Sequence, residues 1–174
     1  NGFRIDGVAA DQETGTAVSN AGDINGDGLD DMVVSGRFAD ALGDVAGAAF
    51  VLFGRDDGFA DTISLSTLNG TNGFRLDGVA AGDIAGIDVS AAGDINGDGI
   101  ADLIVGAPGA GPNGAGSGSS YVVFGSNEDF SATLALSALD GSNGFRLDGA
   151  AAGDDSGRAV SAAGDVNGDG FDDL

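Results

Sequence analysis

Three short segments of the chain carry closely spaced side-chain oxygens that suit a metal ion. They are DINGDGLDD at 23–31, DINGDGIAD at 94–102 and DVNGDGFDD at 165–173, and each copy starts 71 residues after the last. In every copy Asp or Asn stands at positions 1, 3, 5 and 9, and Gly at position 6 allows a sharp bend. An oxygen-rich loop of this kind is built to surround a hard cation, and calcium fits it best.

Each copy offers five candidate ligands, four through side chains and one, at position 7, through the backbone carbonyl of an apolar residue. The candidates in the first loop are Asp23, Asn25, Asp27, Leu29 and Asp31; in the second they are Asp94, Asn96, Asp98, Ile100 and Asp102; in the third they are Asp165, Asn167, Asp169, Phe171 and Asp173. We expect one Ca²⁺ in each loop, three in all. Magnesium fits less well because it keeps several waters. Asn-Gly and Asp-Gly steps also form metal-free hairpin turns, so that alternative stays open.

The composition narrows the classes of function. The chain has 174 residues, a formal net charge of −22, no cysteine and no histidine, and its six basic residues are all arginine. Nucleic acids and anionic membranes are poor partners for such a charge, since both are polyanions. Enzymes usually use His, Cys or Lys for proton transfer or nucleophilic attack. The chain has none of these three residue types, which predicts a protein without catalytic residues. No apolar run approaches the ~20 residues that cross a bilayer, and we expect no membrane insertion.

The whole chain is a tandem repeat. Asn-Gly-Phe-Arg recurs at 1–4, 72–75 and 143–146, which divides the chain into repeats 1–71 and 72–142 and a truncated third at 143–174. Apolar segments between glycine-rich turns predict four strands in each complete repeat, at 3–8, 17–21, 31–35 and 48–53, and at 74–79, 89–92, 102–105 and 120–124. The acidic loop joins the second and third strands and is therefore predicted to connect a hairpin. One helical turn each is expected at 63–68 and 134–139.

Four strands repeated at this period favour an all-β fold of β-propeller blades, each with four antiparallel strands. The recurring phenylalanines Phe3, Phe74 and Phe145 are expected to anchor the core between blades. A blade buries its faces only against neighbours, and a closed ring uses about 4–8 of them. Two complete repeats do not close a ring, so we expect either a longer polypeptide or an assembly of several copies.

The chain resembles the FG-GAP repeat family, the calcium-binding propeller repeats of integrin alpha subunits and of large bacterial surface proteins. The resemblance is carried by VSAAGDINGDG at 89–99, DLIVGAP at 102–108 and YVVFG at 121–125. The Phe-Gly pair of the family name is replaced by Thr14-Gly15, Ala85-Gly86 and Ser156-Gly157. The resemblance implies metal loops on one face and protein-binding loops on the opposite face, here 37–46 and 108–117. These two loops differ between repeats, as unconstrained surface loops also do.

These observations predict a calcium-binding structural or adhesion module of a secreted or cell-surface protein, with Ca²⁺ stabilising the hairpins. An extracellular location is expected because free calcium there is high enough to fill weak oxygen loops. The expected partners are calcium and a protein or glycan, or other copies through blade contacts. Two alternatives stay open: an accessory propeller domain of a larger secreted hydrolase, and a self-assembling extracellular filament or ring component.

Overall fold

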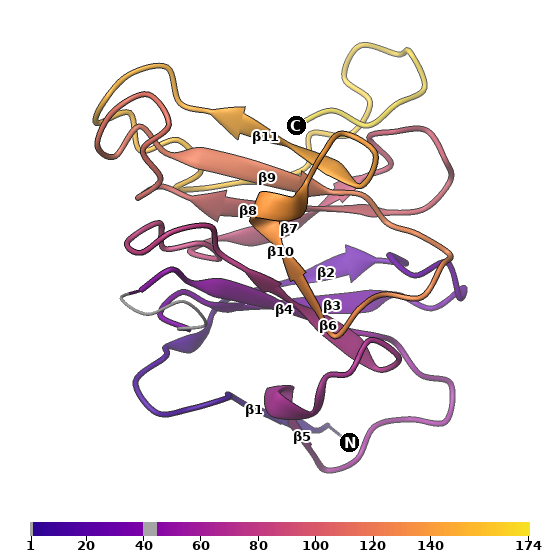
Figure 1. Ribbon diagram of the computed structural model, residues 1–174. Helices are drawn as coiled ribbons and strands as arrows, with labels where there is room; N and C mark the ends of the chain where they lie inside the picture. Colours follow the sequence, from indigo (N-terminus) through magenta and orange to yellow (C-terminus); the bar gives the residue numbers. More distant parts are fainter. Residues whose placement is uncertain (1, 40–44) are drawn as a thin grey trace.

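The computed structural model describes residues 2–39 and 45–174, and these residues form an all-β protein (Figure 1). The strands are β1 (Arg4–Asp6), β2 (Thr14–Gly22), β3 (Asp31–Gly36), β4 (Ala48–Leu52), β5 (Thr62–Ser64), β6 (Gly73–Asp77), β7 (Val89–Gly93), β8 (Asp102–Ala107), β9 (Ser119–Val123), β10 (Thr133–Ala135) and β11 (Gly144–Asp148). Two 3₁₀ turns, η1 (Leu65–Thr67) and η2 (Leu136–Ala138), confirm the helical turns expected at 63–68 and 134–139.

The strands form three stacked layers, which Figure 1 shows from the N-terminus upward. An N-terminal layer pairs β1 with β5 in parallel. The first sheet has the order β10-β6-β4-β3-β2, and the second sheet has the order β11-β9-β8-β7. All neighbours in these two sheets are antiparallel except β10, which pairs with β6 in parallel. Within the described part of the chain the sheets are open.

Each sheet combines strands from two repeats. The first sheet takes β2, β3 and β4 from one repeat and β6 from the next, and the second sheet takes β11 from the third repeat in the same way. Backbone hydrogen bonds therefore tie consecutive repeats together. The eight predicted strands are confirmed as strands, but the first strand of each repeat lies in a different sheet from the other three, so a blade is not formed by one repeat alone. The short strands β5 and β10 were not predicted, and β10 adds a parallel fifth strand where four antiparallel ones were expected.

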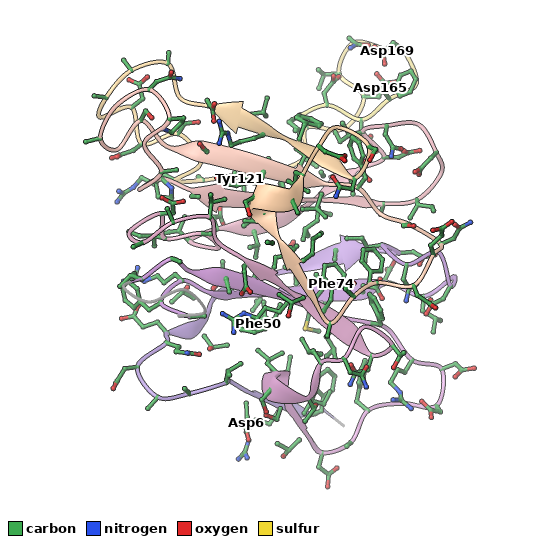
Figure 2. All side chains as sticks on the ribbon, viewed as in Figure 1. Asp6, Phe50, Phe74, Tyr121, Asp165 and Asp169 are labelled. Atoms are coloured by element: carbon green, nitrogen blue, oxygen red, sulfur yellow. The ribbon has the colours of Figure 1, made fainter. Side chains whose placement is uncertain are left out.

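The main core lies between the two sheets. Because side chains alternate across a strand, Val33 and Val51 of the first sheet face Leu103 and Val123 of the second, and all four are fully buried. Phe74, on β6, stacks on Phe130 with ring centroids 4.4 Å apart and rings inclined by 2°. Figure 2 labels Phe74 in the core between the two sheets. Phe74 is thus confirmed as a core anchor, while its equivalents Phe3 and Phe145 are only partly buried.

Close contact between neighbouring repeats also depends on glycine. Gly47 lies in a parallel bridge with Ala85 and has a φ of +80°, and Gly118 bridges Ser156 with a φ of +76°. A Cβ atom on Gly47 would meet the backbone oxygen of Ala85 at 2.2 Å. Only glycine allows this approach without moving the backbone of the next repeat.

The repeat supplies a matched pair of valines that tests the packing. Val89 on β7 packs against the first sheet and is 3% exposed, whereas its equivalent Val18 on β2 lies on the opposite side of the first sheet and is 64% exposed. We expect Val89→Ala to lower the free energy of unfolding by about 2 kcal/mol, because buried methyl groups are lost and a cavity remains. Val18→Ala should change it by less than about 0.5 kcal/mol. Urea denaturation measures both, and equal losses would contradict this arrangement.

Candidate metal-binding loops

The acidic loops lie at one end of the stacked sheets, at the tips of hairpins. The first loop connects β2 to β3, which stay paired up to Gly22 and Asp31, and the second connects β7 to β8, which stay paired up to Gly93 and Asp102. The predicted hairpin connections are therefore confirmed. The third loop is closed by a single bridge between Gly164 and Asp173. Figure 2 shows Asp165 and Asp169 within this third loop.

The first carboxylate of each loop folds the backbone around itself. In the second loop Asp94 Oδ1 accepts the N–H of Asp98 at 3.1 Å, and Oδ2 accepts the N–H of Gly99 at 2.9 Å. The first and third loops repeat both bonds. Gly99 has a φ of +86°, in the region that favours glycine. Its equivalents Gly28 and Gly170 have values of +89° and +93°, so the predicted bend at position 6 is confirmed.

The side chains at positions 3 and 5 are drawn to the same place. Asn96 Oδ1 accepts the N–H of Asp98 at 2.9 Å, and its amide Nδ2 donates to Asp98 Oδ2 at 2.9 Å. Asp98 Oδ1 in turn accepts the N–H of Ile100, the position-7 residue, at 2.9 Å. The bonds to backbone N–H groups recur in the other two loops. The structure thus brings together the predicted ligand residues at positions 1, 3, 5 and 7.

The carboxylate at position 9 has a structural role that the sequence analysis missed. Asp102 is fully buried, and its Oδ2 accepts the N–H of Ile95 at 2.8 Å while its Oδ1 accepts the N–H of Gly125, after β9, at 2.9 Å. Asp31 makes the same two bonds to Ile24 and Gly54. This carboxylate therefore pins the base of its loop to the following strand. The recurring Phe-Gly step at 53–54 and 124–125 was the available signal.

Electrostatics distinguish these buried carboxylates. Burial raises the pKa of Asp31 to about 6, backbone hydrogen bonds from Gly54 and Ile24 oppose the shift, and repulsion from Asp27 and Asp23 adds to it. Burial likewise raises the pKa of Asp102 to about 6. The ion pairs found in residues 2–39 and 45–174 all join arginines to acids outside the loops. In this part of the chain the loop carboxylates thus repel one another without a basic side chain to compensate them.

The donor set matches a hard cation, although not through carboxylates alone. Over the described ranges, no group of three or more acidic side chains is arranged to hold a metal. This is because the position-9 carboxylate is turned to the backbone at the base of the loop. The set gathered at the tip is instead two carboxylates, one amide and the position-7 peptide. Such mixed oxygen donors are the kind that calcium accepts.

The loops predicted to bind a partner lie only partly within the described structure, since residues 40–44 of the loop 37–46 fall outside it. The loop 108–117 follows β8 and precedes β9, at the end of the sheet opposite the acidic loops. Its Asn113 donates through Nδ2 to the carbonyl of Gly149 at 2.8 Å. This loop is therefore tied to the third repeat.

Together, these features define an all-β repeat protein in which acidic hairpin loops recur at one end of stacked sheets. Residues 85–123 match the model of the FG-GAP repeat, so the family resemblance is confirmed, and this segment is an FG-GAP repeat that contains β7, β8 and β9. The match suggests an integrin-like β-propeller module, and FG-GAP repeats occur in extracellular proteins. No match to a curated protein was found. Among the described residues, no helix has the length and apolar character needed to span a membrane.

Proposed function

We propose that the chain is a calcium-binding structural or adhesion module of a secreted or cell-surface protein, without enzymatic activity. The observation that carries this proposal is that three loops repeat one arrangement of inward-turned oxygens, with no basic side chain paired to them in the described structure. In each loop, the side chains at positions 1, 3 and 5 and the carbonyl at position 7 would hold Ca²⁺. The position-9 carboxylate would support the loop from its base, and it would complete the set of ligands only by giving up one of its bonds to the backbone.

The expected effect of calcium is to stabilise the hairpins. The Asp and Asn side chains already order the loop by accepting backbone N–H groups, and a cation among them removes the repulsion between their charges. An ordered loop holds β2 against β3 in one register, and a slip by one residue would turn every buried side chain to the wrong face. At a free calcium concentration of 100 times the dissociation constant, each loop adds about 2.7 kcal/mol to the free energy of unfolding.

The exposed side of the first sheet supports the proposal that the sheets are propeller blades. Phe3, Val18, Met32, Leu52 and Phe59 line an apolar groove there. Their equivalents one repeat later, Phe74, Val89, Leu103, Val123 and Phe130, all belong to the core between the two sheets, where Val89, Leu103 and Val123 of the second sheet pack against the first. A further sheet of the same kind would bury the groove in the same way. The same surface supports a second candidate function, which is self-association of copies through blade contacts. Measurement of the molecular mass in solution, with and without calcium, would test it.

Calcium removal tests the main proposal. We expect chelation to lower the melting temperature of the protein and added Ca²⁺ to restore it, because ligands that bind only the folded state stabilise it. Differential scanning calorimetry across a calcium series provides the measurement. The matched control is a variant with Asp27, Asp98 and Asp169 all replaced by alanine, which should no longer respond to calcium. A melting temperature that stays constant after complete metal removal would refute the proposal.

A further inference from the structure

The second and third acidic loops are joined by a carboxylate, that of Asp172 at position 8 of the third loop. Its Oδ2 accepts the N–H of Asp94 at 2.8 Å, and its own N–H donates to the carbonyl of Asp94 at 3.1 Å. Asp172 thus holds both backbone polar groups of the residue whose side chain organises the second loop. It is adjacent to Asp173, which holds the base of the third loop through the N–H of Val166 at 2.9 Å.

The first and second loops meet without such a carboxylate, because position 8 of the second loop is Ala101. The N–H of Ala101 donates to the carbonyl of Asp23 at 3.2 Å, which keeps the backbone bond. The methyl side chain of Ala101, however, has no acceptor to offer the N–H of Asp23. Of the two junctions between acidic loops, the one between the second and third loops therefore has a side-chain connection, and the one between the first and second has none.

A second carboxylate crosses the junction between the second and third repeats in the opposite direction. Asp88 Oδ2 accepts the N–H of Val160 at 2.9 Å, and the residue equivalent to Asp88 in the first repeat is Ala17. Among the described residues, the apolar cluster at this junction has three buried members, Ala92, Ile104 and Val122, against seventeen in the core between the sheets. The two carboxylates thus occur where burial contributes least to holding the repeats together.

We propose that Asp172 is a positioning residue that couples cation binding in the second loop to cation binding in the third. The inference rests on the proposed function, that the loops bind cations. Asp172 fixes the backbone from which the Asp94 ligand projects, and it is itself fixed by the order of the third loop. An ion that orders one loop therefore lowers the cost of ordering the other, and the coupling must be reciprocal. The first loop, which has only a backbone bond to the second, is coupled less.

Calcium titration followed by NMR tests this coupling loop by loop. The amide signals of Gly26, Gly97 and Gly168 report the first, second and third loops separately. Asp169→Ala removes a candidate ligand from the third loop, and we expect it to weaken calcium binding in the second loop roughly fivefold, within the usual range for coupled sites. In the Asp172→Ala background the same change should leave the second loop unaffected. The affinity of the first loop should change least in these variants.

Two further variants separate positioning from charge and from general damage. Asp30→Ala removes a carboxylate from position 8 of the first loop, where Asp30 is exposed and meets Asn20 Nδ2 at 3.4 Å, and it should preserve the coupling. Asp172→Asn keeps a side-chain oxygen that accepts the N–H of Asp94, so it should also preserve the coupling while removing the charge. Loss of coupling in Asp172→Asn as complete as in Asp172→Ala would overturn the positioning role.

The remaining outcomes distinguish the coupling from the function on which it rests. If no glycine signal responds to calcium, metal binding itself is wrong. If the signals respond but Asp169→Ala leaves the second loop unchanged, metal binding stands and the coupling is refuted. Hydrogen exchange provides a metal-free check: without calcium, the Asp94 amide should exchange several-fold faster in Asp172→Ala than in the wild type. An unchanged exchange rate would show that the Asp172 contact does not hold the second loop.

Discussion

Replacing Phe74 with alanine is expected to lower the free energy of unfolding by about 3–5 kcal/mol, the usual cost of removing a fully buried phenylalanine. Phe74 is 0% exposed, stacks on Phe130 and lies 5.9 Å from the ring of Phe53. The three rings come from β6 and from the segments after β4 and before β10, so they join two repeats. Denaturation in guanidinium chloride, monitored by tyrosine fluorescence and circular dichroism, measures the loss.

Phe3 is the matched control, because it occupies the same place one repeat earlier. It contacts Phe59 at 4.5 Å between ring centroids but remains partly exposed. We expect Phe3→Ala to cost about 1 kcal/mol, since much of the ring already contacts water in the folded state. A loss for Phe3→Ala as large as that for Phe74→Ala would mean that the N-terminal layer is as tightly packed as the main core.

Replacing Asp102 with alanine is expected to cost about 2–5 kcal/mol even when calcium has been removed. Its two oxygens accept the N–H groups of Ile95 and Gly125, and the alanine variant would leave both donors without a partner at the base of the hairpin. An unsatisfied buried donor costs about 1–3 kcal/mol. Chemical denaturation in the presence of a chelator measures this structural contribution separately from any metal effect.

Two aspartates provide the comparison for Asp102. Asp173, at the same position of the third loop, is partly exposed, and its carboxylate accepts one backbone N–H, that of Val166, at 2.9 Å, so its alanine variant should cost less than about 1 kcal/mol. Asp98 is exposed, and Asp98→Ala should matter mainly with calcium present, when it weakens the second loop. If Asp102→Ala were harmful only in the presence of calcium, the structural role of its carboxylate would be wrong.

The sequence predicted what depends on neighbouring residues. Alternating apolar residues located the strands from β2 to β4 and from β7 to β9, and the Asn-Gly and Asp-Gly steps located the hairpin loops with their bend at Gly28, Gly99 and Gly170. The prediction of strands from the sequence failed where pairing with a distant segment decides whether a strand forms. The strands β5 and β10 have three residues each, and they are strands only because β1 and β6 offer them an edge. The equally short β1 was predicted because it lies in a longer alternating segment at 3–8, whereas β5 and β10 overlap the segments interpreted as helical turns at 63–68 and 134–139.

In the candidate site, too, contacts within one loop were predictable from the sequence and contacts between distant residues were not. The spacing within nine residues predicts the grouping of positions 1, 3 and 5, because those side chains bond to backbone groups of their own loop. The second partner of Asp102 is Gly125, 23 residues away, and Asp94 meets Asp172 across 78 residues. No local pattern reveals such contacts. Calcium itself remains a prediction from the chemistry and repetition of the oxygens.

The sharing of strands between repeats has a mechanical consequence. β6 pairs with β4 in the first sheet but belongs to the repeat that goes on to build the second sheet. Two adjacent repeats cannot be pulled apart until that strand has been torn from β4, breaking its ladder of antiparallel hydrogen bonds. In a module stretched between two surfaces, the sheets would therefore unfold one at a time. Each shared strand would resist separation of its two repeats until its hydrogen bonds break.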